Sequence, residues 1–292
     1  MKGMVKCVNK MQLRVATWNI GSLLGFACDD AWYLRYQAAL ETLSELNLDV
    51  LCVQELPGNM DAVFRFSRDL DLPFYVFKEL SVGSKGSDVT GIGVFSRFPI
   101  ELLDEHVMHN PCYQFPHRSA LGALGTMRPE RTHDKAFICT NVAGVVVITG
   151  HALPLHRYGI DPQVLGDSYK RLADWIVGKA EGSFPVVVAG DFNLANLDAV
   201  MPALPIVFTS AVEGATRPES EVQHDYIFAS SFMDAQETRI VEAYSKSAGG
   251  KGPLFDHRMV FAEFFFEGDN LAKHREAFVA AYRDELSSAG LL

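Results

Sequence analysis

The sequence predicts an α/β (α+β) protein built around a mixed β-sheet, and three observations indicate this fold class. Apolar runs of strand length recur along the whole chain of 292 residues. Amphipathic helical patterns separate some of these runs, whereas only turn residues separate others, so both parallel and antiparallel pairs are expected. Hydrophobic residues make up 48% of the chain, and strands this apolar need helices or a second sheet over both faces.

The first hundred residues alternate strand and helix patterns. Four apolar runs predict strands, at 13–18, 48–54, 74–79 and 91–100. Between the first two, apolar residues at spacings of four and three predict a helix with one apolar face, formed by Trp32, Tyr36, Ala39, Leu43 and Leu46. The glycine- and serine-rich stretch 83–91 is expected to form a turn between the third and fourth strands.

The rest of the chain resumes this pattern after an irregular segment at about 103–135 that is rich in His, Pro and Arg. Five further strands are predicted at 136–141, 145–150, 185–190, 225–230 and 258–266, the first two forming a hairpin about Ala143 and Gly144. Helices are predicted at about 166–180 and 270–287. Because no repeat or linker interrupts the chain, we expect a single domain over 1–292 with a C-terminal helical extension at about 268–292.

Composition and charge narrow the class of protein. The formal net charge of −10 argues against a non-specific polyanion binder, because phosphate contacts need Lys and Arg, but acidic residues suit a site that recruits cations. The sequence contains no run of about 18 apolar residues, so we expect no membrane span, and we recognise no signal peptide at its start. Five scattered cysteines without C-x-x-C spacing indicate buried thiols in a reducing compartment, so we expect a cytoplasmic protein. We also expect a monomer.

Polar side chains stand where the apolar runs begin or end. Four runs stop on polar residues and two begin just after them, and these positions are Asn19, Glu55, His151, Asp191, Asn193, Asp225, Asp256 and His257. If the last two strands run antiparallel to the other four, all these side chains meet at one edge of the sheet, where open α/β sheets usually bind ligands. Taken singly, an Asp or Asn after a strand is more often a turn residue, and a lone Glu or His is more often a solvated surface group.

The residue types at these positions suit metal-assisted phosphoryl chemistry. Carboxylate and amide oxygens without thiolates favour Mg²⁺ or Mn²⁺ over zinc, and Glu55 and Asp256 would carry the charge. A histidine beside acidic groups suits a general base. A cation of this kind typically neutralises the charge that develops on a phosphate and stabilises the leaving oxygen.

Seven segments resemble, in order, the signature of the endonuclease/exonuclease/phosphatase superfamily with its DNase I-like fold. They are "TWNIGS" (17–22), "CVQEL" (52–56), "GIGVFSRFPI" (91–100), "TGH" (149–151), "GDFNLA" (190–195), "HDYIFAS" (224–230) and "FDHRMV" (255–260). The resemblance implies a four-layer sandwich of two packed, mixed, mostly antiparallel β-sheets flanked by helices. It also implies a hydrolase that acts on phosphate esters.

Two motifs depart from the usual pattern of the superfamily. Phe255 and Met259 stand where a Ser and a Pro are usual around the Asp-His pair, and Gln223 and His224 replace a basic residue and an Ile before the Asp-Tyr pair. The acids and the histidine are retained, so we expect activity. The changed neighbours leave open which branch of the superfamily the chain resembles.

The resemblance implies a role for each matching residue. Glu55 would be the main metal ligand, with Asn19 and Asp256 in the same metal shell. His257 would be the base, or a proton carrier on the phosphate side, oriented by Asp225. Whether such a site holds one metal ion or two stays open.

Three further residues would act on the water and on the phosphate. Asp191 would position or activate the attacking water, and Asn193 would bind the phosphate. His151 would donate a hydrogen bond to a non-bridging phosphate oxygen. In-line attack would then invert the phosphate and release an alcohol.

Substrate selectivity should come from loops at the rim. The segment at about 103–135 interleaves basic and aromatic side chains and includes Arg118; it could grip a nucleic-acid backbone, and a solvated loop is the equal alternative. Arg157, shortly after the "TGH" segment, is a further candidate for phosphate contact.

Three hypotheses for the function follow. The preferred one is a metal-dependent nuclease, endo- or exonucleolytic, or a related phosphodiesterase acting on DNA or RNA. The second is a phosphomonoesterase or phosphodiesterase acting on a small or lipid phosphate, as in inositol phosphatases and sphingomyelinases. The third is a catalytically idle binding module, which the intact set of acids and histidines disfavours.

Overall fold

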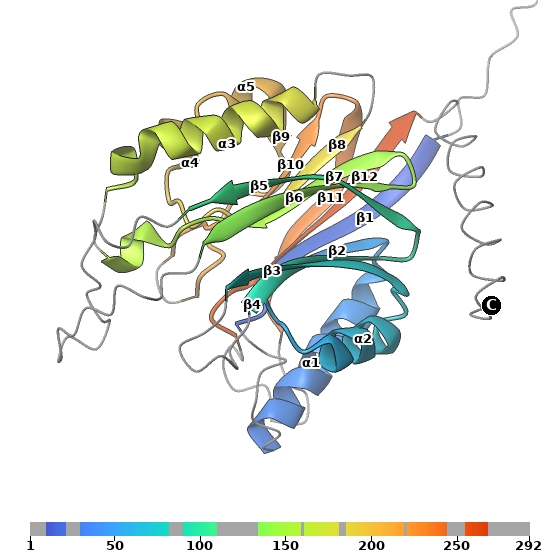
Figure 1. The fold of residues 1–292 in the computed structure, drawn as a ribbon. Coiled ribbons are helices and arrows are strands. Elements are labelled where there is room, and N and C mark those ends of the chain that lie inside the picture. Colours follow the sequence, from blue (N-terminus) through green and yellow to red (C-terminus); the bar gives the residue numbers. More distant parts are fainter. Residues whose placement is uncertain are drawn as a thin grey trace, which may run out of the picture.

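Two six-stranded β-sheets pack face to face in a computed structural model of the chain, with helices over their outer faces (Figure 1). The structure describes residues 10–21, 30–81, 90–109, 134–158, 161–180, 185–218, 221–243 and 255–267. Each sheet contains one parallel pair among antiparallel pairs. This architecture confirms the predicted four-layer α/β sandwich.

The first sheet joins the first and last strands of the described chain. Its strands, in spatial order, are β11 (Met233–Val241), β12 (Met259–Glu267), β1 (Lys10–Asn19), β2 (Val50–Pro57), β4 (Thr90–Ser96) and β3 (Phe74–Ser81). β1 is parallel to β2 and antiparallel to β12. Both faces of β2 are covered, and its residues are accordingly almost all buried and apolar.

The second sheet repeats this plan with strands from the middle of the chain. In spatial order it contains β5 (Ile100–Met108), β6 (Lys135–Val142), β7 (Val145–His151), β8 (Val186–Asp191), β10 (Asp225–Ser230) and β9 (Phe208–Ser210). β7 is parallel to β8, and β10 is antiparallel to β8. β6 and β7 form the predicted hairpin, which turns through Ala143 and Gly144, both at positive φ.

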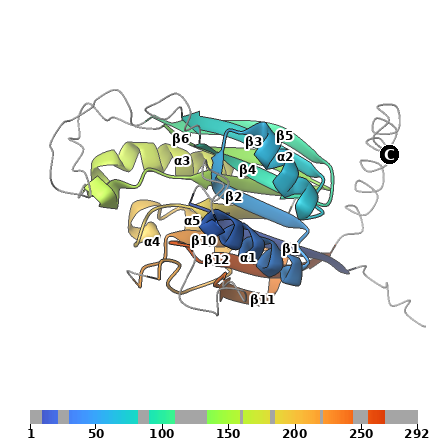
Figure 2. The same cartoon turned by 90° about the horizontal axis from the view of Figure 1, so that it is seen from below.

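Helices cover the outer faces of the two sheets. The helices α1 (Asp30–Leu46) and α2 (Met60–Asp69) lie against the first sheet, in front of it when seen from below (Figure 2), and α3 (Gly166–Lys179) lies against the second. Two short helices, α4 (Leu197–Val200) and α5 (Leu204–Val207), follow β8, and the 3₁₀ turns η1 (Leu155–Tyr158) and η2 (Pro162–Leu165) precede α3. None of the helices in the described ranges is both long and apolar enough to cross a membrane.

The alternation of side chains along each strand divides the core into three layers. On β2, Val50 and Cys52 belong to the core between the sheets, whereas Leu51 and Val53 pack under α1 and α2. A third layer lies between the second sheet and α3, where Ile176 is fully buried. Each sheet is therefore apolar on both faces, which fixes the strand registers strongly.

The strand registers bring the predicted polar positions to one end of the sandwich. β12 and β10 run antiparallel to β1 and β8, as the site hypothesis requires. Asp225 at the start of β10 lies opposite Asp191 at the end of β8, and His151 at the end of β7 lies on the other side of Asp191. The ends of four strands and the starts of two therefore form a common rim.

Several elements differ from the sequence prediction. The segment expected to be irregular from about 103 is still β-strand up to Met108 in β5. Neither α2 nor β11 was predicted: α2 is short and carries the exposed apolar residues Met60 and Phe64, and β11 is an edge strand with mostly exposed polar residues. The predicted helix at 270–287, and the extension at 268–292, lie outside the described residues.

Two glycines let the parallel strands β7 and β8 approach closely just below the rim. Gly150 and Gly190 are register partners, and a Cβ added to Gly190 would lie 2.4 Å from the backbone oxygen of Gly150. A side chain there would force the backbones of the two strands apart, since a backbone oxygen cannot turn away as a flexible side chain can. Close packing at this point thus requires glycine.

We expect Gly190→Ala to lower the free energy of unfolding by about 2–3 kcal/mol, measured by urea denaturation followed by circular dichroism. Gly178→Ala in α3 is the matched control, because a Cβ there meets nothing within 4 Å and should leave stability unchanged or raise it by about 1 kcal/mol. Equal stability of the two variants would show that the strands separate at little cost.

Candidate active site

The rim of the sandwich collects the eight polar residues that the sequence singles out. They end or precede strands of both sheets, and they are Asn19 (β1), Glu55 (β2), His151 (β7), Asp191 (β8), Asn193 (after β8), Asp225 (β10), and Asp256 and His257 (before β12). All but Glu55 and Asp256 are buried. Because buried carboxylates are stable only when they are paired or hydrogen-bonded, each acid of the rim needs a specific partner.

Asn19 connects the acids of the two sheets. Its Nδ2 donates to Glu55 Oε1 at 3.3 Å in the first sheet and to Asp191 Oδ2 at 3.0 Å in the second. Its Oδ1 accepts from the backbone N–H of Gly21 at 3.0 Å, which fixes the orientation of the amide. A single side chain therefore sets the spacing between two carboxylates from different sheets.

Glu55 leaves the regular strand at this point. The pairing of β2 with β4 shifts register between Gln54 and Leu56, and Glu55 has a φ of 56°, a left-handed conformation that is unusual for this residue type. A bulge of this kind redirects a side chain away from the regular alternation of the strand. Backbone strain at a polar rim residue is typical of functional sites.

His257 and Asp225 form a buried pair across the two sheets. His257 Nδ1 lies 2.8 Å from Asp225 Oδ2, and both side chains are almost completely buried. The backbone oxygen of His257 accepts a hydrogen bond from Trp18 Nε1 at 3.2 Å, which anchors the residue to the first sheet. The second ring nitrogen, Nε2, faces Asp191 Oδ2 at 3.9 Å.

Asp191 is the centre of the remaining contacts. Its Oδ1 accepts from the backbone N–H of Asn193 at 2.9 Å, and its Oδ2 lies 3.4 Å from His151 Nε2. Asn193 has a φ of 53° and donates from Nδ2 to the backbone oxygen of Ala152 at 3.0 Å. These contacts hold Asp191 between two histidines and two asparagines.

The buried acids change the protonation of the site. Burial, and next the Asp225 carboxylate, raise the pKa of Asp191 to about 6. Burial alone would lower the pKa of His257, but the neighbouring carboxylates, Asp225 first, outweigh it and raise this pKa to about 9. The neighbouring carboxylates therefore favour the protonated form of the His257 imidazole.

The carboxylates of the rim suit a hard divalent cation. Glu55 and the half-exposed Asp256 offer carboxylate oxygens beside the buried Asp191, Asp225 and His257, whose side chains each place one polar atom within 4.8 Å of the other two. Asp256 Oδ1 would lie 3.0 Å from a Cβ at Gly21, next to Asn19, so the absence of a side chain there makes room for this carboxylate. Oxygen donors without thiolates are typical of Mg²⁺ and Mn²⁺ sites.

The unusual residues in the two family motifs have structural explanations. Phe255 packs its ring edge-on against Trp18 at 4.5 Å, and Met259 is completely buried under the outer helices. Gln223 accepts from the backbone N–H of Gly214, and its Nε2 donates to the backbone oxygen of Val212. These substitutions alter core and loop packing and leave the polar rim residues in place.

Four residues of the site were missed by the sequence reasoning. Gln54 donates to Thr17 and Thr149 and so ties the two sheets together directly below Glu55. Lys135 Nζ lies 3.1 Å from His151 Nδ1, and Arg217 Nη2 lies 3.5 Å from Asp256 Oδ2. Thr216 is buried in the segment between β9 and β10. Of these four residues, only Gln54 could have been recognised from the sequence, because it is a polar residue inside an apolar run.

Of the three residues expected to bind substrate, Asn193 lies at the rim, whereas the side chains of Arg118 and Arg157 lie outside the described part of the chain. Arg118 lies outside the described residues, as does most of the basic segment around it. The backbone of Arg157 belongs to η1, but its side chain is outside the described part of the chain. His106 also belongs to the basic segment at about 103–135. It lies on β5, and the centroid of its ring is 5.6 Å from that of Trp175.

A comparison with known proteins identifies the family of this chain. The sequence model of the endonuclease/exonuclease/phosphatase family matches residues 16–245. No curated protein sequence matches the chain significantly.

Solved structures of low sequence identity share the fold. An endonuclease/exonuclease/phosphatase from Beutenbergia cavernae DSM 12333 superposes with a TM-score of 0.60 at 18% identity, over 88% of this chain and 72% of that one. The human Nocturnin catalytic domain with bound sulfate gives 0.59 at 16% identity, over 89% and 97%. ANGEL2, described as a 2′,3′-cyclic phosphatase, gives 0.56 at 16% identity, over 89% and 97%.

These matches cover most of the chain, and the solved structures share the fold of the two six-stranded sheets. The chain belongs to the endonuclease/exonuclease/phosphatase family, whose members hydrolyse phosphate esters, and it has their DNase I-like fold.

Proposed function

We propose that this protein is a divalent-metal-dependent phosphodiesterase that cleaves DNA or RNA with Mg²⁺ or Mn²⁺. The observation that carries the proposal is the buried His257–Asp225 pair facing Asp191, at a rim that also presents Glu55 and Asp256. Burying two acids, Asp191 and Asp225, beside a histidine lowers stability, and groups buried at such a cost are typical of functional sites. An idle binding module would not need this set.

The cation would be held by Glu55 and Asp256, with Asn19 in the same shell. When bound, it neutralises charge on the phosphate and stabilises the leaving oxygen. Asn19 contributes by orienting Glu55, because in this structure its amide nitrogen, not its oxygen, faces that carboxylate. Arg217 lies beside Asp256 and supplies a positive charge on the outer side of the site.

The proton chemistry follows from the two shifted groups. Asp191, with both oxygens held by hydrogen bonds and a raised pKa, is suited to align a water molecule and accept its proton. The carboxylates around His257 raise its pKa, which favours a proton carrier that donates to a phosphate oxygen over the alternative role of the base. Asp225 keeps the imidazole oriented through Nδ1, and His151 and Asn193 complete the phosphate-binding side.

Phosphodiesters of nucleic acids are the preferred substrates. Lys135 beside His151 and Arg217 beside Asp256 both add positive charge at the rim, which favours a polyanionic substrate. ANGEL2 is described as a 2′,3′-cyclic phosphatase, and cleavage of that diester also fits this chemistry. Purified protein should be incubated with Mg²⁺ and single-stranded DNA, duplex DNA, RNA, a 2′,3′-cyclic nucleotide, and inositol and other soluble phosphomonoesters. Turnover of the monoesters alone would replace the nuclease proposal by a phosphatase.

Removal of divalent cations should abolish turnover, and Mg²⁺ or Mn²⁺ should restore it. Glu55→Gln removes one negative charge from the cation site at nearly constant shape, and we expect kcat/KM to fall by at least about 100-fold. The matched control is Glu101→Gln on the exposed face of β5, which should keep wild-type activity. An unchanged Glu55→Gln enzyme would remove Glu55 from the proposed metal shell.

His257→Ala should lower kcat by about 100- to 10,000-fold, because it removes the proton carrier of the reaction, and KM should change little. Steady-state kinetics on the best substrate of the panel measures both constants. Glu101→Gln again serves as control, since Glu101 is exposed on β5 and lies outside the proposed site. A loss confined to substrate binding would assign His257 to recognition and contradict the proposed chemistry.

A further inference from the structure

The His257–Asp225 pair joins strands that share no hydrogen-bonded ladder. Asp225 begins β10 of the second sheet, and His257 precedes β12 of the first. Pairing within each sheet therefore leaves the spacing of the two side chains undefined. A contact between the starts of these two strands has to fix it.

Thr216 makes this contact from the segment between β9 and β10. Its side chain is completely buried, and its Oγ1 accepts from the backbone N–H groups of His224 at 2.9 Å and of Asp225 at 3.1 Å. Its backbone oxygen accepts from the N–H of Arg258 at 2.7 Å, the residue that follows His257. One residue thus binds the chain at both members of the pair.

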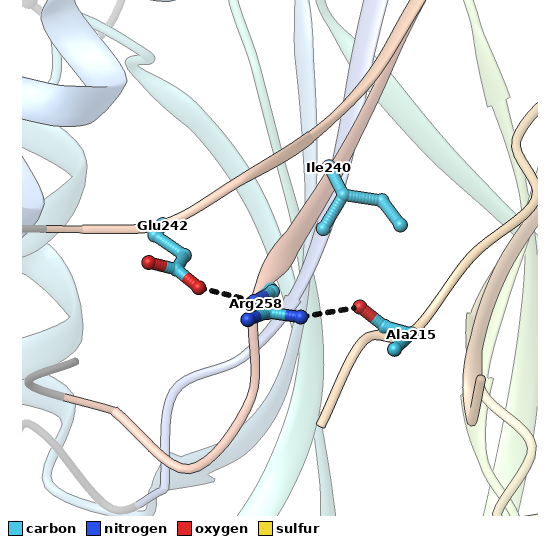
Figure 3. A pocket seen from close by; sticks show the side chains of 4 residues that line it. All are labelled: Ala215, Ile240, Glu242 and Arg258. Carbon is cyan, nitrogen blue, oxygen red and sulfur yellow. Dashed lines mark hydrogen bonds and ion pairs between the residues drawn. The ribbon is translucent and has the colours of Figure 1, made fainter. Parts of the chain in front are cut away.

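A second set of contacts holds Thr216 itself in place. Arg258 donates from Nη1 to the backbone oxygen of Ala215 at 3.0 Å and from Nε to Glu242 Oε1 at 2.5 Å (Figure 3). With Ile240, these residues line a cavity of about 480 Å³ beside the rim. The guanidinium therefore fastens the segment around Thr216 to the strand that follows His257.

The Asp225 carboxylate needs this backbone anchor. Oδ2 contacts His257, whereas the buried Oδ1 has no hydrogen-bond partner among the described residues. No second donor therefore fixes the rotation of the carboxylate within that part of the chain. Its position depends on its own backbone, which Thr216 holds.

We propose that Thr216 is a positioning residue for the reaction: its hydroxyl fixes Asp225, and through Asp225 it sets the orientation of the His257 imidazole. This inference rests on the proposed role of the His257–Asp225 pair in phosphodiester hydrolysis. Thr216 does not touch the substrate. Its loss should affect the chemical step and not substrate binding.

The test compares Thr216→Val with Thr216→Ser. Valine keeps the shape and removes the acceptor, and we expect kcat to fall about 10- to 100-fold with KM nearly unchanged. Serine retains the acceptor and should restore kcat. As a readout independent of turnover, the proton shared by His257 Nδ1 and Asp225 should lose its downfield resonance in the NMR spectrum of the valine variant and keep it in the serine variant.

Ser230→Ala controls for a merely structural effect. Ser230 stands at the other end of β10, and its buried hydroxyl also accepts from a backbone N–H, that of Val186 at 3.0 Å. Its loss should lower the melting temperature and leave kcat and the resonance unchanged. If the valine variant does not fold, Thr216→Ala carries the same test.

The inference is overturned if the valine or alanine variant keeps wild-type kcat, if kcat falls no further than in Ser230→Ala, or if the folded serine variant loses activity. A wild-type enzyme without turnover of any phosphodiester would overturn the proposed function. The NMR comparison would still decide whether Thr216 orients the pair.

Discussion

The buried ion pair between His257 and Asp225 is the interaction on which the site depends. Asp191 is completely buried close to Asp225, and two carboxylates in so little water repel each other strongly. The nitrogens of the His257 ring lie 2.8 Å and 3.9 Å from these carboxylates, so a proton on the ring offsets this repulsion. Removing the histidine would leave two uncompensated buried acids, which costs far more than an ordinary loss of one hydrogen bond.

The fold brings these groups together through the directions of its strands. A parallel pair in each sheet puts two carboxyl ends side by side, and one antiparallel neighbour in each sheet adds the start of a strand at the same edge. Cross-sheet contacts then set the distance between the two edges. Asn19 links the two sheets by donating hydrogen bonds to the carboxylates of Glu55 and Asp191. Gln54 links them by donating to the hydroxyls of Thr17 and Thr149. Strands and the residues next to their ends therefore supply most of the site, whereas Thr216 lies farther from a strand, in the segment between β9 and β10.

The sequence was sufficient for the sandwich and for the acids and histidines of the rim, because both leave a local pattern. An apolar run that stops on Asp191 or His151 shows a strand and its end at once. Lys135 and Thr216 leave no such pattern, since a single Lys or Thr beside a strand has many ordinary uses and acquires its role only from residues distant in the chain. The same reason hides β11, an edge strand whose exposed polar residues form no apolar run.

The acidic composition of the chain gains a specific meaning at the rim. Glu55 and Asn193 adopt left-handed backbone conformations, and Asp191 and Asp225 are buried as neighbouring acids, so the site stores strain and charge repulsion that the rest of the core must offset. One imidazolium cannot balance the carboxylates gathered there. A divalent cation would supply the missing positive charge and would also attract a phosphate. Under the proposed function, an acidic protein therefore binds a polyanionic substrate through a cation, without the extended basic surface that its net charge argues against.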